Sequence, residues 1–319
     1  MSEVTIREYR LGDEYGIIKL FKEVFGRDMS IEEWQWKYRG QGNDKVLAVV
    51  LEDRESGIVG YYGSITLRMI RDGKEIKGVA AGDTMIHPKH RSFVRLKKMR
   101  NLWVDESLRE SVIMFYGFSP ERIVKLAVER LGIYDTAEPV YEAAKDVRFN
   151  NDPSRFLYKL SPLSFDDGRI DELWDKAKHQ FKLSVIRDSA YFQWRYKNHP
   201  LFSYEIWGLT RRWSSHLAGL AVLKKEDSDN LLLMDMVFRE KNLAPLLKKV
   251  ENLAFSIGKK KMGLWLPYRM HPELETLGFI SRPSGATIPT MPQSGHPSTI
   301  KKDEVVANFY YTCGDTDFL

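Results

Sequence analysis

The feature that most constrains the fold is an internal repeat of one aromatic and basic string. Residues 34–39 read Trp-Gln-Trp-Lys-Tyr-Arg, and residues 192–197 read Phe-Gln-Trp-Arg-Tyr-Lys. Both strings have the same order of residue classes: aromatic, Gln, Trp, basic, Tyr and basic. Because a duplicated unit keeps the order of its elements, this match predicts two copies of one folding unit along the chain.

Similar segments follow each string in the same order. The paired segments are two strand-like runs, the second with a central glycine, then a strand that carries an aspartate, and then a Leu-Gly step: 46–51 with 204–209, 58–61 with 217–220, 82–85 with 234–237, and 131–133 with 277–279. Each copy therefore predicts helix, three strands, helix, strand, helix and strand, which is a mixed α/β fold.

Local signals place several elements more closely. The patterns predict strands over 4–8, 74–86, 111–118 and 305–311, a helix closed by Gly26, a helix begun by a Ser30 and Glu33 capping box, a hairpin turn at Asp72-Gly73, a helix over 92–106 and a long loop over 283–298.

The length and one polar segment predict the domain boundaries. A chain of 319 residues favours two domains, since a domain has roughly 150 residues. The polar segment from Arg148 to Asp167 separates the two copies. We therefore predict an N-terminal domain over 1–150, a linker over 151–168 and a C-terminal domain over 169–319.

Composition narrows the class of protein. Apolar residues make up 43% and charged residues 29%, which is typical of a folded globular chain. No apolar stretch approaches a membrane span, and the first residues do not resemble a signal segment, so we expect a cytoplasmic protein. The single Cys313 and the absence of clustered histidines predict no metal site. The net charge of +5 suits an anionic partner, or simply reflects solvated helix faces.

The strand over 74–86, the following His87-Pro88-Lys89-His90-Arg91 and the basic helix resemble the GNAT superfamily of acyl-CoA N-acyltransferases. With the repeat, the resemblance is to its tandem-domain form. It implies two tandem GNAT-like domains, each a mixed and mostly antiparallel sheet flanked by helices. It also implies acetyl-CoA as the coenzyme.

In that family, backbone amides at a helix N-terminus hold the coenzyme A pyrophosphate, since unpaired N–H groups and the helix dipole favour an anion. The resemblance assigns this role to Ile86, His87, Arg91, Ser92, Val94, Arg95, Leu96 and Lys97. The family's glycines are missing here, because Ser92-Phe93-Val94 follows Arg91, and the second copy over 238–243 has none either. The alternative is an ordinary exposed basic helix.

The resemblance also implies catalytic groups. A strand carboxylate would take a proton from the acceptor amine, and Asp83 fits this position, with Asp235 as its counterpart. The family's tyrosine acid is replaced by Val128 in the first copy, so Tyr116 or Tyr134 would substitute. The alternatives are that the carboxylates close a turn or pair with an arginine, and that the tyrosines belong to the core.

We therefore expect an acyl-CoA-dependent N-acyltransferase that transfers an acetyl group to the amine of a small molecule or amino sugar, with the first copy as the active one. Two alternatives stay open. One is an aminoacyl-transferase of the peptidoglycan-bridge type, although the sequence has no extended basic arm and nucleic acid is not an expected partner. The other is a non-catalytic binding or scaffold protein that keeps the fold.

Overall fold

The computed structural model describes residues 3–40, 45–151, 156–225, 228–292 and 296–316. The chain divides into two compact units, and neither is continuous in sequence. The first comprises Met1–Arg68, Ile76–Glu138 and Thr287–Glu304, and the second Met69–Glu75, Pro139–Ala286 and Val305–Leu319. The boundaries 1–150, 151–168 and 169–319 stay a prediction about domains that fold on their own.

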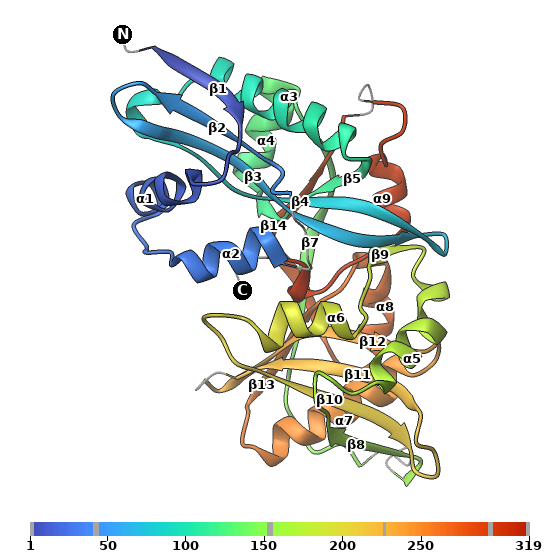
Figure 1. Ribbon diagram of the computed structural model, residues 1–319. Coiled ribbons are helices and arrows are strands. Elements are labelled where there is room, and N and C mark those ends of the chain that lie inside the picture. The colour runs from blue at the N-terminus through green and yellow to red at the C-terminus, as the bar shows by residue number, and fades with distance from the viewer. Residues whose placement is uncertain (1–2, 41–44, 152–155, 226–227, 293–295, 317–319) are drawn as a thin grey trace. The chain divides into compact units, whose positions relative to one another are not determined.

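The first unit is built around the sheet β1-β2-β3-β4-β5 (Figure 1). Its elements are β1 Val4–Glu8, α1 Asp13–Phe25, α2 Ile31–Arg39, β2 Ala48–Asp53, β3 Gly57–Arg71, β4 Lys74–Ile86, α3 Phe93–Arg109, β5 Val112–Tyr116, β6 Ser119–Pro120 and α4 Glu121–Leu126. The pairs β1–β2 and β2–β3 are antiparallel, whereas β4 and β5 are parallel. The far end of β3, over Met69–Arg71, belongs to the second unit and pairs with β9, Leu183–Val185.

Strand β2 shows why this sheet is buried on both faces. Ala48 and Val50 pack with residues of α1 and α2, whereas Val49 and Leu51 pack with Met99 and Trp103 of α3. The helices accordingly lie on opposite sides of the strands (Figure 1). An uninterrupted apolar run is what a strand covered by helices on both faces requires.

The second unit is built around the sheet β14-β7-β13-β12-β11-β10-β8. Its elements are β7 Asp135–Asp146, β8 Tyr158–Pro162, α5 Arg169–Ala177, β9, α6 Ser189–Phe192, β10 Tyr204–Arg211, β11 Leu217–Lys224, β12 Asn230–Phe238, α7 Leu243–Ser256, β13 Lys261–Trp265, α8 His271–Thr276, β14 Ile280–Thr290, α9 Lys302–Asn308 and β15 Phe309–Tyr310. The first residues of β7, 135–138, and the last residues of β14, 287–290, belong to the first unit. Strands β12 and β13 are parallel, as β4 and β5 are.

The predicted repeat is confirmed at the level of elements. The aromatic strings lie on α2 and on α6 with the π-helical turn Gln193–Lys197. In each copy two strands, an aspartate-bearing strand, a helix and a parallel strand follow. Gly132 and Gly278, both with positive φ, then follow the next helical segment. The predicted mixed α/β class is correct, as are the Ser30 cap and the Asp72-Gly73 turn.

Two predicted elements near the C-terminus are wrong. The predicted loop over 283–298 begins as strand β14, in which Gly285 takes a φ of 82° and so accommodates a turn-rich sequence within a strand. The predicted strand over 305–311 is mostly helix α9. Asp303 and Glu304 favour a helix N-terminus, and Val305 is buried while Val306 is exposed. Only Phe309–Tyr310 is a strand.

Candidate functional site

Strands β4 and β5 separate close to the predicted site of the first unit. Their last paired residues are Ala80 and Tyr116, and β4 continues beyond this point to Ile86. Asp83 lies in this stretch of β4, which no longer pairs with β5. The residues that the sequence assigns to coenzyme binding follow directly, in the turn Pro88–His90 and the start of α3.

Asp83 is held in place by two residues of the aromatic string. Lys37 Nζ lies 2.7 Å from Asp83 Oδ2, and Tyr38 OH donates to the same oxygen at 2.6 Å. No residue in the described part of the chain bonds Oδ1, and the Asp83 side chain is 14% exposed. Asp83 also has a φ of 48°, which is uncommon for a residue with a side chain within a strand. The site therefore presents one fixed carboxylate with one accessible oxygen.

The two candidate tyrosines differ in their surroundings. Tyr116 is buried at the end of β5, where its ring packs edge-on against Phe118. Tyr134 lies beyond Gly132, and its buried hydroxyl has no hydrogen-bond partner among the described residues. The guanidinium carbon of Arg100 lies 5.6 Å from the centre of the Tyr134 ring, and Arg100 donates to Ile133 O at 2.7 Å. Burial lowers the pKa of Arg100.

The start of α3 is open to solvent. Ser92 is the N-cap, and its hydroxyl accepts from the Arg95 amide at 3.5 Å. Phe93 and Val94, in the first turn, are exposed. Helix geometry leaves the amides of this turn without intrahelical partners. The Arg91 and Arg95 side chains donate to Ile86 O and His90 O, which holds both guanidinium groups near the turn.

The remaining residues of the predicted coenzyme set lie around this turn. Ile86 is buried at the end of β4, His87 accepts from the Lys89 amide, Leu96 packs against the core, and Lys97 is exposed on α3. The structure thus brings the whole set to one turn and one helix start. Whether these residues bind coenzyme A stays a prediction.

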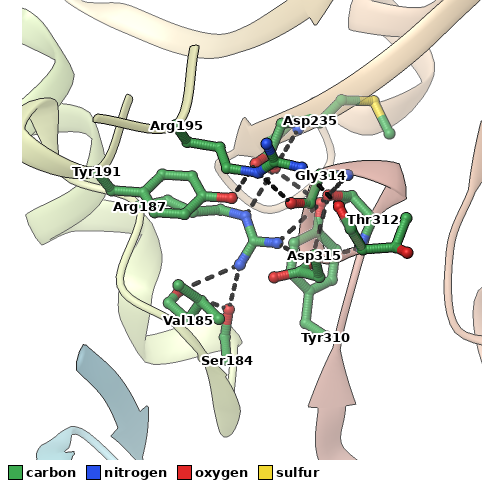
Figure 2. Close-up of polar contacts among 12 residues, drawn as sticks. Ser184, Val185, Arg187, Tyr191, Arg195, Asp235, Tyr310, Thr312, Gly314 and Asp315 are labelled. Atoms are coloured by element: carbon green, nitrogen blue, oxygen red, sulfur yellow. Dashed lines mark hydrogen bonds and ion pairs between the residues drawn. The ribbon is translucent and has the colours of Figure 1, made fainter. Parts of the chain in front are cut away.

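Asp235, the counterpart in the second unit, lies in a closed network (Figure 2). Arg187 Nε lies 2.7 Å from its Oδ1, while Tyr191 and Tyr196 donate to its Oδ2 at 2.8 and 2.9 Å. The Met236 amide also donates to Oδ1. The Asp235 and Arg187 side chains are fully buried. Asp235 therefore has both oxygens bonded, in contrast to Asp83.

The C-terminal segment Thr312–Thr316 completes this network. Arg187 also pairs with Asp315, and Arg195 donates to Gly314 O at 2.8 Å and to Thr316 O at 2.5 Å (Figure 2). Burial lowers the pKa of Arg187, but Asp235 and Asp315 raise it to a net value well above the ordinary one. Burial, with Asp235 close by, raises the pKa of Tyr191 and Tyr196.

Sequence reasoning missed several partners of the two aspartates. Lys37, Tyr38 and Tyr196, which bond the aspartates, belong to the repeated aromatic strings, but the repeat by itself does not link the strings to the aspartates. Arg187 and Thr312–Thr316 have no counterpart in the repeat, so only the tertiary fold identifies them. The aromatic members of the strings are mainly core residues, since Trp34, Tyr38, Phe192 and Tyr196 are almost fully buried.

Solved structures share this architecture over most of the chain. A GCN5-related N-acetyltransferase of Anabaena variabilis ATCC 29413 superposes with a TM-score of 0.65 at 13% identity, covering 90% of this chain and 72% of that one. The chain has the GNAT fold. A probable N-acyltransferase of unknown function from Enterococcus faecalis V583 gives 0.67 at 10% identity, covering 92% and 73%.

Saccharomyces cerevisiae N-myristoyltransferase, solved with bound myristoyl-CoA, has the same fold with a TM-score of 0.60 at 11% identity, covering 100% of this chain and 86% of that one. Neither a protein-family model nor a curated protein matches the sequence. Because these identities are low, the structural similarity establishes the GNAT fold and does not identify the reaction.

Two further findings concern the described residues. None of their helices combines the length and the apolar character needed to cross a membrane. No cluster of three or more His, Cys, Asp or Glu side chains among them could hold a metal ion.

Proposed function

We propose that the chain is an acyl-CoA-dependent N-acyltransferase whose first unit carries the active site. The observation that supports this most is the contrast between the two aspartates. Asp83 keeps one oxygen accessible beyond the point where β4 and β5 separate, whereas Asp235 is sealed with four hydrogen bonds. A carboxylate that must accept a proton from a substrate needs an accessible oxygen.

The starts of helices α3 and α7 also differ in exposure, and again the one in the first unit is the more exposed. Phe93 and Val94 at the start of α3 are exposed, whereas Asn242 and Leu243 at the start of α7 are buried, and Tyr158 OH bonds Asn242 Oδ1. An anion such as a pyrophosphate is favoured at the free amides of a helix N-terminus. The residues around α3 fit such a group, with Arg91, Arg95 and Lys97 supplying positive charge, and the start of α7 does not.

Bound acyl-CoA supplies the acyl group as a thioester. In the proposed reaction Asp83 Oδ1 accepts a proton from the acceptor ammonium, directly or through water, and the free amine then attacks the acyl carbon. Lys37 and Tyr38 bind Asp83 Oδ2 and so fix the orientation of Oδ1 towards the acceptor. As the C–N bond forms and the C–S bond breaks, Tyr134, whose hydroxyl has no partner among the described residues, donates its proton to the departing sulfur and is reprotonated by the proton that the new amide nitrogen loses. Holding amine and thioester together supplies much of the rate.

The acceptor is proposed as the amine of a small molecule or amino sugar, and the acyl group as acetyl or a longer chain. Thermal unfolding with acetyl-CoA and with longer acyl-CoAs tests the proposal first. A ligand at one hundred times its dissociation constant adds about 2.7 kcal/mol of stability. No stabilisation by any acyl-CoA would favour the non-catalytic alternative.

A further inference from the structure

In the second unit, the segment Thr312–Thr316 packs beside Asp235. It fills a slot that is lined by Asp235, Arg187, Arg195 and Tyr196. Strands β12 and β13 pair up to Leu233 and Leu264, and β12 then continues past Asp235 paired with β11 but no longer with β13. Beside this stretch lies the 3-10 turn Cys313–Asp315, preceded by Thr312 as its cap. Asp235 is therefore covered by the segment that follows β15.

Two buried arginines bind this segment. Arg187 is fully buried and contacts the Asp315 carboxylate, and its Nη2 lies 3.4 Å from Thr312 Oγ1. Arg195 is 5% exposed and donates to two carbonyl oxygens, Gly314 O and Thr316 O. Without the segment, both guanidinium groups would lose acceptors and Arg187 would keep only Asp235 as a carboxylate partner. Buried charges without partners are costly, so these arginines require an occupant with acceptors in these places.

The fit is tight at Gly314. A Cβ atom added there would lie 2.9 Å from Asp235 Oδ2 and 3.1 Å from Met234 O, and closer still to Tyr196 OH. Asp235 Oδ2 and Tyr196 OH bond each other, and Arg187 and Tyr191 also bond Asp235, so these two groups cannot move aside independently. The slot thus selects a peptide with no side chain at this position and a carboxylate at the next.

We infer that this slot is a peptide-binding site, and that its ligand is the chain's own segment Thr312–Thr316. The ligand class is a short peptide that carries a glycine followed by an acidic residue. The occupied slot closes the second unit at Asp235, so this carboxylate is not accessible for acyl transfer. The inference stands whether or not the first unit binds acyl-CoA, because it concerns contacts within the second unit only.

The lone cysteine gives a direct readout of the closed state. Cys313 is the only cysteine in the chain, it is fully buried in the segment, and burial raises the pKa of its thiol. A thiol in this state is unreactive towards alkylating agents. Release of the segment would expose the thiol and restore its reactivity.

The experiment compares the full-length wild type with Gly314→Ala, and with Gly168→Ala as the matched control, since a Cβ at Gly168 meets nothing within 4 Å. We expect iodoacetamide to modify Cys313 at least 100-fold faster in Gly314→Ala than in wild type or Gly168→Ala, while far-UV circular dichroism stays native. Asp315→Asn, which removes the carboxylate and adds no bulk, should show the same change if Gly314→Ala fails to fold.

Peptide binding completes the test. A fluorescein-labelled peptide of residues 309–316 should bind Gly314→Ala by fluorescence anisotropy, and should not bind wild type, whose slot is filled. The same peptide with Asp315→Asn should bind at least tenfold more weakly. The inference is overturned if Cys313 stays protected in both variants, if its exposure only follows global unfolding, or if the peptide does not distinguish the variant from wild type.

Discussion

Tyr38 donates its hydroxyl proton to Asp83 Oδ2 at 2.6 Å, and this contact recurs in the second copy. There Tyr196, at the same place in the aromatic string, donates to Asp235 Oδ2 at 2.9 Å. The repeated string and the repeated aspartate are thus two ends of one interaction. The other partners differ. Lys37 pairs with Asp83, whereas Arg187 and Tyr191 bond Asp235 and the segment Thr312–Thr316 covers it.

Asp83→Asn should lower turnover by about a hundredfold or more and change acyl-CoA affinity less than threefold. An amide cannot accept the proton, and general base catalysis contributes roughly 10²–10⁴-fold. Turnover and melting temperature should be measured on one preparation. Asp166→Asn, the same change at a half-exposed aspartate of the second unit, is the control and should retain full activity. If Asp83→Asn keeps full turnover per folded molecule, Asp83 has no part in the reaction.

Arg95→Glu should weaken acyl-CoA binding at least tenfold, because it places a negative charge at the start of α3. Lys260→Glu is the matched charge reversal, at an exposed lysine of the second unit that pairs with Asp229. It should leave binding unchanged. Isothermal titration with acetyl-CoA measures both. Equal losses in the two variants would indicate nonspecific attraction rather than a site at α3.

Tyr134→Phe should lower turnover with little change in stability, because the hydroxyl that it removes has no partner among the described residues. Tyr196→Phe is the contrasting variant. Its hydroxyl bonds the buried Asp235, so the loss should cost about 1.5–3 kcal/mol of unfolding free energy. Urea unfolding and steady-state kinetics separate the two effects. Unchanged turnover in Tyr134→Phe would remove this residue as the acid.

Arg187→Met should destabilise the second unit by about 3–5 kcal/mol, because it leaves the buried carboxylates of Asp235 and Asp315 without their shared cation. Lys197→Met breaks a surface pair with Asp166, in which both side chains are about half exposed, and should cost less than about 1 kcal/mol. Urea unfolding measures both. Similar losses for the two variants would contradict the importance assigned to the buried network.

Glu106 should make the first unit lose stability as the pH rises from about 4.5 to about 7. Burial, with the carboxylate of Glu8 nearby, raises the pKa of Glu106 from 4.5 to about 7. The folded state therefore binds this proton more tightly than the unfolded state does. The stabilisation by protonated Glu106 is fully present below about pH 4.5 and is lost as the pH rises through about 7. Over this range the unfolding free energy falls by at most about 1.4 kcal/mol per pH unit.

The difference in unfolding free energy between wild type and Glu106→Gln, followed across this pH range, isolates that contribution. The amide has no proton to lose, so the variant should lack the slope. Identical pH profiles for the two proteins would show that Glu106 titrates normally in the folded state.

Much of the fold was predictable because it rests on local and repeated signals. The Ser30 cap, the Asp72-Gly73 turn and Gly132 act over a few residues, and the duplicated string ordered the elements around them. The helix over Lys302–Asn308 was missed because a short apolar run such as Val305-Val306 is compatible with either helix or strand. At the site, Asp83 and Asp235 are predicted from the resemblance to the GNAT superfamily together with their paired strand positions. The arginine and C-terminal contacts of Asp235 join residues far apart in sequence, and no local pattern encodes such contacts.

Strand β2 has a consequence for how the first unit reaches its structure. Its residues from Ala48 to Leu51 are all apolar and all buried, so a shift of pairing by one residue would still place apolar groups on both faces. Over these four residues, polarity therefore does not distinguish the register of β2 against β3. Side-chain size does so at Leu51, whose Cβ would lie 2.9 Å from a Cβ added at Gly60. Enlarging Gly60 should therefore slow correct pairing and populate a misregistered intermediate during refolding, even where the final fold is retained.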